Sequence, residues 1–164
     1  MNKEKFLAMI TQHRKMIYKI CHSYCPDPEK RNDLQQEILL QLWNSFGKYD
    51  GRSKISTWMY RISLNTAISF YRKDKKHREK KVEADEWLIS LPESESIEQE
   101  DPIALLYCFI NKLNDFDKAL ILLYLDDYKQ EDIAEVLGIT KTNVGTKIGR
   151  IKKVLKELAN NYQN

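Results

Sequence analysis

YKQEDIAEVLGITKTNVGTKIGRIKKVLKEL, residues 128–158, is the stretch that decides the fold of the C-terminal part of this chain. Four apolar residues, Ile133, Ala134, Val136 and Leu137, give a first short helix an apolar face. Gly138 can end that helix at a positive φ, and the hydroxyl of Thr140 can cap the next helix. The pattern predicts two helices joined by a tight turn, which is a helix-turn-helix.

The second helix of this motif has a regular apolar stripe, because Val144, Ile148, Ile151 and Leu155 recur three or four residues apart. If that stripe packs inward, the outward face is polar and basic and suits a major groove. Its members are Lys141, Asn143, Thr146, Lys147, Arg150 and Lys153. The alternative is an ordinary helical hairpin with a basic solvent face, but the spacing and the turn chemistry favour DNA binding.

Two glycines interrupt this second helix. Gly145 and Gly149 each cost ~1 kcal/mol of helix stability relative to Ala, and they remove side chains from the expected DNA-reading surface. A glycine also lets the backbone lie close to a phosphate.

Length and composition limit the class of protein. With 164 residues and 42% apolar content, the chain can build one ordinary domain or two small ones. There is no run of about 18 apolar residues, and the first residues lack the apolar core of a secretion signal. Three cysteines cannot form a complete disulfide framework. We therefore expect a soluble cytoplasmic protein with reduced thiols.

The net charge of +3 conceals a strong segregation of charge along the chain. Residues 1–81 contain 18 Lys and Arg against 8 Asp and Glu, a net +10, whereas residues 82–102 contain no basic residue and 8 acidic ones, a net −8. Residues 103–164 carry 9 basic and 8 acidic residues, a net +1. Within this range the positive charge lies at the C-terminal end, because residues 141–164 carry 6 basic residues and 1 acidic residue, a net +5. Basic regions at both ends suggest that the partner is a polyanion.

Helical periodicity runs through most of the chain, and no alternating strand pattern is present. The first expected helix runs from about Phe6 to Tyr24 and is closed by Pro26 and Pro28. A second helix is expected at 33–46 and a third at 56–73, with Ser56 as its cap. Two further helices are expected, one starting at Asp101 and Pro102 and one at 117–125. The helix that starts at Pro102 has an apolar face formed by Leu105, Phe109 and Leu113. The fold class is therefore all-α, with two small helical domains.

The segment between the domains is rich in Glu and Ser and poor in large apolar residues. Such a composition is typical of a flexible linker. We therefore divide the chain into an N-terminal domain at 1–81, an acidic linker at 82–102 and a C-terminal domain at 103–164.

The helix at 56–73 carries a polar stripe opposite its apolar face. Its members, three or four residues apart, are Trp58, Arg61, Asn65, Ser69 and Arg72. Arg and Asn can bond phosphates and base edges, and the basic run 72–81 lengthens the same track. Trp58 could stack on unpaired bases together with the nearby Tyr49 and Tyr60. The alternative is a solvated helix face in which Trp58 packs in the core, and for Trp58 itself packing is the favoured role.

No catalytic or metal site is expected. Cys21, His22 and Cys25 lack a second Cys/His pair to complete a tetrahedral set, so buried thiols are the favoured interpretation. His13 and His77 have no nearby carboxylate partner that is arranged for catalysis, and neither a phosphate-binding glycine loop nor an activated-serine motif is present. The sequence therefore predicts no enzyme activity, no metal and no cofactor.

Two blocks resemble a known family. DLQQEILLQLWNSFGKYDGRSKISTWMYRISLNTAISFYRK, residues 33–73, and the helix-turn-helix are similar to the two conserved domains of bacterial sigma factors. The resemblance is to the small extracytoplasmic-function (ECF) group of the sigma-70 family, and it covers most of the chain except the acidic linker. The stretch GITKTNVGTKIGRIKKVLKEL, residues 138–158, also resembles the version common in Bacteroidetes.

This resemblance implies a dissociable initiation subunit that binds core RNA polymerase, directs it to promoters and helps to melt the −10 element. It implies that the helix at 33–46 docks on the clamp helices of the largest polymerase subunit, with Asp33, Gln36, Glu37 and Trp43 as contacts. The loop 48–53, with Lys48, Tyr49, Arg52 and Ser53, resembles the element that captures a flipped −10 base. Arg61, Asn65 and Ser69 fall where family members contact the melted DNA strand, and Trp58 and Arg72 complete the expected −10 surface.

For the −35 element, the resemblance assigns readout to Lys141, Asn143, Thr146 and Lys147 and phosphate contacts to Arg150, Lys152 and Lys153. Many family members carry a side chain where this sequence has Gly145 and Gly149. The acidic linker could mimic nucleic acid in a basic polymerase channel. The resemblance also implies an anti-sigma partner, because members of this family commonly have one, and in similar Bacteroidetes systems that partner is membrane-bound. No stable homo-oligomer is expected.

Two rival hypotheses remain open. An autonomous transcriptional regulator would bind duplex DNA as a dimer through the helix-turn-helix, which requires paired half-sites and a self-complementary interface. A structural or interaction protein made of helical pairs would bind no nucleic acid in a salt-dependent way.

Overall fold

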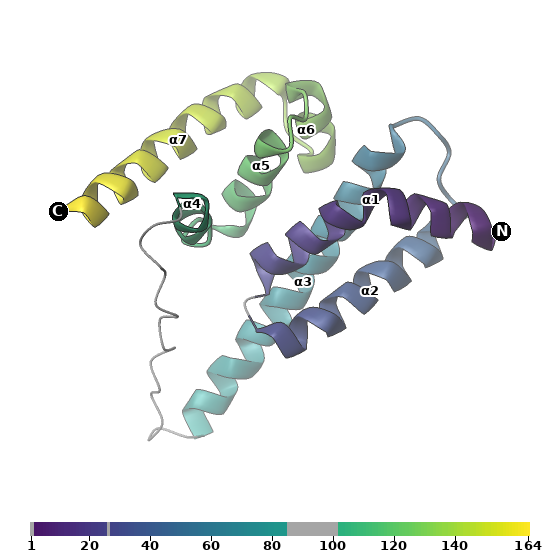
Figure 1. Cartoon of the computed structure of the whole chain (residues 1–164), viewed down its shortest axis with the longest axis horizontal. Helices are drawn as coiled ribbons and strands as arrows, with labels where there is room; N and C mark the ends of the chain where they lie inside the picture. Colours follow the sequence, from purple (N-terminus) through teal and green to yellow (C-terminus); the bar gives the residue numbers. More distant parts are fainter. Residues whose placement is uncertain (1, 26, 85–101) are drawn as a thin grey trace.

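The computed structural model describes residues 2–25, 27–84 and 102–164. These ranges contain helices and no β-strand: α1 (Lys3–Tyr24), α2 (Pro28–Phe46), α3 (Ile55–Ala84), α4 (Pro102–Ile110), α5 (Asp115–Leu125), α6 (Gln130–Leu137) and α7 (Lys141–Gln163). Helices α1–α3 form one domain and α4–α7 the other (Figure 1). The predicted all-α class with two helical domains is confirmed. Most of the predicted linker, residues 85–101, lies outside the described residues.

The N-terminal domain is a three-helix unit in which α1 and α2 pack against the long helix α3 and against each other. Each helix contributes an apolar stripe to the core at the expected spacing. The buried members are Phe6, Met9, Ile17, Ile20, Cys21 and Tyr24 of α1, Leu34, Ile38 and Leu42 of α2, and Met59, Tyr60, Leu64 and Ala67 of α3. The first helix is confirmed, and Asn2 caps it by accepting hydrogen bonds from the amides of Glu4 and Lys5.

Helix α2 begins five residues before the predicted start at Asp33. The side chain of Asp27 accepts a hydrogen bond from the amide of Glu29 at 3.0 Å and so caps the helix, with Pro28 in its first turn. Proline suits this position because its missing N–H needs no partner there. Pro28 therefore opens the second helix in addition to following the first.

Helix α3 differs from the prediction at both ends. It begins at Ile55, because the carbonyl of Lys54 accepts the amide of Trp58 at 3.0 Å, so Ser56 lies inside the first turn instead of capping it. It ends at Ala84 instead of about Lys73. Residues 74–84 contain no Pro or Gly and are rich in Lys and Glu, which favour helix, so nothing in the sequence stops it.

The C-terminal domain contains the predicted helix-turn-helix. Gly138 ends α6 with a φ of 68°, and the Thr140 hydroxyl accepts a hydrogen bond from the amide of Asn143 at 3.2 Å, capping α7. Two boundaries differ from the predictions. Helix α4 ends at Ile110, so Leu113 lies beyond it, and α5 begins at Asp115 because Asn114 accepts the amide of Asp117 at 2.8 Å.

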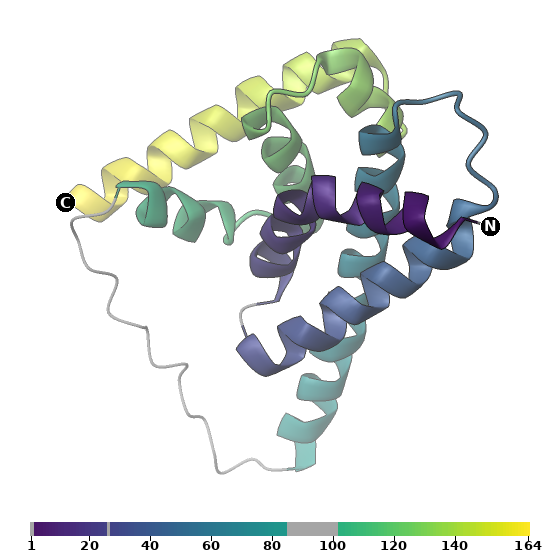
Figure 2. The ribbon, with the colours of Figure 1, turned by 45° about the vertical axis from the view of Figure 1, so that its right-hand side comes forward.

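Helix α5 is buried on all sides over six consecutive residues, from Lys118 to Leu123. A helix that is buried all round must be covered by neighbours on every face. Helices α6 and α7 cover part of it, and the N-terminal domain also reaches it, because the Tyr24 hydroxyl donates to the carbonyl of Asp115 at 2.9 Å. The buried side chains of both domains form one continuous cluster from Phe6 to Ile151. The two domains are therefore packed together, with α6 beside the N-terminal end of α3 (Figure 2).

Candidate nucleic-acid interface

The polar stripe predicted on α3 is divided between two neighbours. Its residues do share one side of the helix, but Arg61 and Arg72 contact the C-terminal domain, whereas Asn65 and Ser69 border α2. The predicted −10 surface is thus not a single open face in this conformation.

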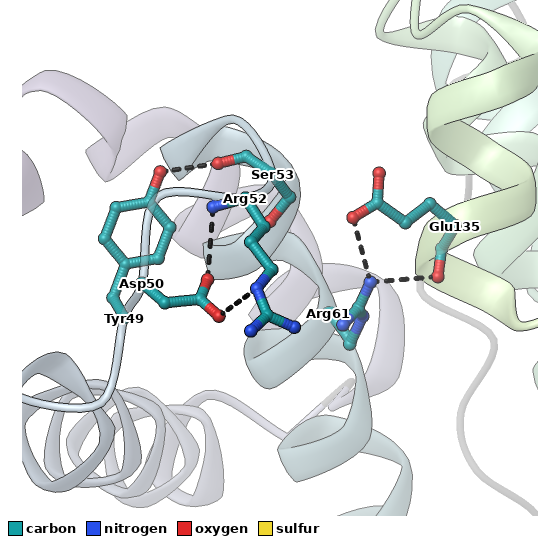
Figure 3. A network of polar contacts seen from close by, with 6 residues as sticks. All are labelled: Tyr49, Asp50, Arg52, Ser53, Arg61 and Glu135. Carbon is teal, nitrogen blue, oxygen red and sulfur yellow. Dashed lines mark hydrogen bonds and ion pairs between the residues drawn. The ribbon is translucent and has the colours of Figure 1, made fainter.

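Arg61 is bound by the first helix of the helix-turn-helix (Figure 3). One of its terminal nitrogens donates to the backbone carbonyl of Glu135 at 3.1 Å and lies 3.4 Å from the Glu135 carboxylate. Farther along α3, Nε of Arg72 lies 3.3 Å from a carboxylate oxygen of Asp115 at the start of α5. Two guanidinium groups expected to meet DNA phosphates therefore pair with carboxylates.

Asn65 and Ser69 are exposed and line a groove of about 430 Å³ between α2 and α3. The groove has a mixed polar and apolar lining, which comes from Glu37, Gln41, Asn65, Thr66, Ser69, Phe70 and Lys73. It joins one residue of the predicted polymerase-binding set, Glu37, to two residues of the predicted −10 set.

The loop between α2 and α3 is held by its own side chains. The hydroxyl of Tyr49 donates to the carbonyl of Ser53 at 2.5 Å, and Asp50 accepts from the amide of Arg52 and pairs with its guanidinium at 2.9 Å (Figure 3). Gly51 allows the turn with a φ of 75°. The loop thus presents the Arg52 side chain, 89% exposed, at its tip.

The remaining predicted −10 residues differ in accessibility. Lys48 is exposed, whereas Trp58 is half-buried with its ring centroid 5.2 Å from that of Tyr49. Trp58 packs on the core, as favoured from the sequence. In the basic run, Lys73, Lys75 and Lys76 are exposed on α3, and the side chains from residue 77 onward lie outside the described part.

On α2, the four predicted polymerase contacts are not equivalent. Asp33 and Gln36 are exposed, and Glu37 is half-buried and accepts a hydrogen bond from Gln41 at 2.8 Å. Trp43 is half-buried against Phe6, with ring centroids 4.9 Å apart.

Leu40 was not predicted as a site residue, yet it is 50% exposed, one helical turn after Gln36. The sequence does carry a signal for it, because Leu40 lies off the buried stripe of Leu34, Ile38 and Leu42. Leu40 thus adds exposed apolar surface beside the polar contact candidate Gln36.

Helix α7 presents its predicted polar face to solvent. Val144, Ile148 and Ile151 are buried beneath it, as the stripe predicted. The exposed members of the predicted −35 set are Lys141, Asn143, Thr146, Arg150, Lys152 and Lys153.

Three lysines of that set already have partners within the C-terminal domain. Lys141 pairs with Glu131 of α6 at 2.5 Å, and Lys152 donates to the hydroxyl of Tyr124 at 2.8 Å. Lys147 is half-buried, with its ammonium 5.1 Å from the centre of the Phe116 ring. The side chain of Lys147 therefore contributes to packing. The exposed members of the set outside these three contacts are Asn143, Thr146, Arg150 and Lys153.

The cysteines near the end of α1 are buried thiols, as favoured from the sequence. Burial raises the pKa of Cys21 to about 11, and it also raises the pKa of Cys25. Both thiols therefore stay protonated near neutral pH. Within the described ranges, no three His, Cys, Asp or Glu side chains are grouped so as to hold a metal ion. No helix of the described part is long and apolar enough to cross a lipid bilayer.

Comparison with known proteins matches both domains to one family. Residues 9–77 match sigma-70 region 2, and residues 103–155 match sigma-70 region 4. The sigma factor YlaC of Bacillus subtilis is 30% identical over 142 residues, which are 79% of this chain and 77% of YlaC. The ECF sigma factor SigX of the same species is 23% identical, over 94% of this chain and 84% of SigX.

Solved structures show the same fold. The sigma factor RpoE from Bartonella quintana, crystallised with the anti-sigma factor NepR, superposes with a TM-score of 0.72 at 19% identity. The match covers 96% of this chain and 98% of that one. Since both sigma-70 regions are present in the family's order and a relative at 30% identity spans most of the sequence, the chain belongs to the sigma-70 family of RNA polymerase sigma factors, in its ECF group.

Proposed function

We propose that the chain is an initiation subunit that binds core RNA polymerase, directs it to specific promoters and promotes melting of the −10 element. The observation that carries this proposal is the joint presence of two surfaces on one chain. One is the polar side of α3 with the loop before it, and the other is the exposed basic face of α7, the second helix of the helix-turn-helix. No catalytic role is proposed.

We propose the following roles for individual residues. Asp33 and Gln36, with Leu40 beside them, contact the polymerase clamp helices, assisted by Glu37 and the exposed part of Trp43. The loop 48–53 captures a flipped −10 base, and the stripe on α3 binds the melted DNA strand.

On α7, Asn143, Thr146 and Lys141 read the −35 element, and Arg150, Lys152 and Lys153 bind phosphates. Lys147 contributes less to readout than expected from the sequence, since its ammonium lies over Phe116.

The proposal extends to partners and setting. We propose that domains at 1–81 and 103–164 are joined by the acidic linker 82–102 and that the chain is cytoplasmic. We also propose a membrane-bound anti-sigma partner, since RpoE of Bartonella quintana was crystallised with an anti-sigma factor. The Bacteroidetes character of residues 138–158 is likewise proposed from the sequence alone.

Transcription from a library of linear templates with randomised upstream regions tests the function. Core RNA polymerase is supplied with or without the chain, and the RNAs are sequenced. We expect start sites that depend on both components and that share two upstream elements. An identical RNA population with and without the chain would refute the proposal, and tight dimeric binding of the lone chain to duplex DNA would favour the autonomous regulator.

A further inference from the structure

Lys152 of α7 has a defined partner in Tyr124, which lies in the last turn of α5. Its ammonium donates to the Tyr124 hydroxyl at 2.8 Å and lies 4.6 Å from the centre of the Tyr124 ring. A cation over an aromatic ring is attracted to it, so the ring and the hydroxyl act on the same ammonium. The charge of Lys152 is therefore placed at the junction of α5 and α7, which pack directly on each other.

The position of Lys152 on α7 differs from that of the other basic residues of the set. Lys152 follows the buried Ile148 by four residues, so it lies at the edge of the buried side of the helix, whereas Arg150 and Lys153 lie on the outward side. A helix in the major groove directs its outward side at the base edges, and the two sugar-phosphate backbones pass along its flanks. Lys152 is exposed on such a flank.

The pair retains hydrogen-bond donors that it does not use internally. Tyr124 occupies one of the three N–H donors of the Lys152 ammonium. The Tyr124 hydroxyl accepts that bond and still has its own O–H to donate. Among the described residues this hydroxyl has no other hydrogen-bond partner, and Tyr124 is 36% exposed. A neutral donor and a cationic donor thus lie next to each other at the surface.

A phosphodiester is the ligand whose chemistry suits this pair. Its oxygens accept hydrogen bonds from both an ammonium and a hydroxyl, and both kinds of side chain bind DNA phosphates. The exposed Asp127 lines a hollow of about 440 Å³ on the α6 side of Tyr124, together with Lys129 and Gln130. An anion is therefore favoured on the α7 side of Tyr124, where Lys152 lies.

We propose that Tyr124 and Lys152 together bind one backbone phosphate beside the −35 element, each donating to the phosphate oxygens. This inference rests on the proposed function and deepens it, because it adds a residue of α5, outside the helix-turn-helix, to the phosphate-binding set. Tyr124 has two effects in this site. It supplies a neutral donor, and it restricts the flexible side chain of Lys152, which reduces the conformational entropy lost on binding.

Tyr124→Phe tests the site, because it removes the hydroxyl and keeps the ring. The matched control is Tyr162→Phe, the same change at a 49% exposed tyrosine of α7 whose ring contacts Phe109. Lys152→Ala and the double variant complete the set. Fluorescence anisotropy measures binding of each full-length chain to a mixed-sequence DNA duplex, from low salt upward and without polymerase. Circular dichroism verifies that each variant retains its helices and its thermal midpoint.

We expect Tyr124→Phe to bind the duplex about 3- to 10-fold more weakly than Tyr162→Phe does, with an unchanged slope of log affinity against log salt, since a neutral donor releases no counterion. Lys152→Ala should lower that slope by about 1. On the Lys152→Ala background, Tyr124→Phe should still weaken binding, but by a smaller factor than on the wild-type background, because the two donors share one phosphate.

Equal duplex affinities for Tyr124→Phe and Tyr162→Phe would overturn the proposal, and so would a wild-type chain that does not bind the duplex at low salt. An equal loss from Tyr124→Phe on both backgrounds would exclude a shared phosphate, and no loss on the Lys152→Ala background would exclude direct donation by Tyr124. The proposed function is tested separately, by polymerase-dependent transcription. A chain whose pair binds duplex as expected but which supports no transcription would refute the proposed function and leave this site standing.

Discussion

The ammonium of Lys118 lies 3.1 Å from the carbonyl oxygen of Ser23, in the last turn of α1. That carbonyl is among those that a helix leaves without an internal partner at its end. Lys118 also lies 5.0 Å from the centre of the Tyr24 ring. A residue of the C-terminal domain thus caps a helix of the N-terminal domain.

Replacing Lys118 should separate the contribution of its methylene stem from that of its charge. Lys118→Ala removes both and leaves a space among buried side chains, so we expect a loss of about 2 to 3 kcal/mol in the free energy of unfolding. Lys118→Met keeps most of the volume and relieves the desolvated charge, so it should cost about 1 kcal/mol or less. Urea unfolding followed by circular dichroism measures both, and equal losses would contradict the dominance of packing.

The two glycines within α7 should be replaceable by Ala with a gain in stability. A Cβ at Gly149 meets nothing within 4 Å, and one at Gly145 lies 3.7 Å from the Gln130 side chain, an ordinary contact. Each substitution should therefore stabilise the chain by up to about 1 kcal/mol in thermal unfolding. Gly138→Ala is the control and should destabilise it, since Gly138 has a φ of 68°. A loss of stability in Gly149→Ala would show a constraint that packing does not explain.

Arg150→Ala should weaken binding to duplex promoter DNA more than Lys147→Ala does. Arg150 is exposed on the outer face of α7, whereas the ammonium of Lys147 rests over Phe116. Loss of one phosphate contact should lower the slope of log affinity against log salt by about 1. Titration of the polymerase-bound protein with a promoter fragment at several salt concentrations measures this slope, and an unchanged slope would remove Arg150 from the phosphate-binding set.

Alkaline pH should destabilise the fold. Burial raises the pKa of Tyr24 and Tyr60 above the usual 10.0, and it raises the pKa of Cys21 from 9.0 to about 11. The folded chain therefore retains protons that the unfolded chain releases, so this stability is complete below pH 9 and is lost as the pH rises. The lowered pKa of Lys118 makes stability rise with pH, because the folded chain releases this proton before the unfolded chain does. That rise ends once the pH passes the unfolded pKa of 10.5.

The free energy of unfolding should accordingly fall by about 2 kcal/mol or more between pH 9 and pH 11. Urea midpoints across this range measure the fall. Cys21→Ala should reduce its slope in the lower part of the range, and Tyr60→Phe in the upper part. A midpoint independent of pH in this range would contradict the burial of these groups.

Much of the local structure follows from the sequence because its causes are local. The apolar stripe of Val144, Ile148 and Ile151 predicted the buried face of α7, and Gly138 with Thr140 predicted the turn before it. Predictions of helix ends from local signals were wrong at two places. Pro28 follows one helix but also opens the next, so α2 starts earlier than predicted. No Pro or Gly follows Lys73 before Ala84, so α3 continues to Ala84.

The sequence by itself determined the helices, the segregation of charge and the two blocks that indicate a sigma factor. It could not determine that Arg61 meets Glu135, 74 residues away, or that the polar stripe of α3 divides between α2 and the C-terminal domain. Helical periodicity specifies which side of a helix is polar, whereas the occupant of that side depends on how separate helices pack. Only the tertiary structure brings the acidic residues of α5 and α6 onto the basic surface of α3, because that pairing depends on the shared core beneath it.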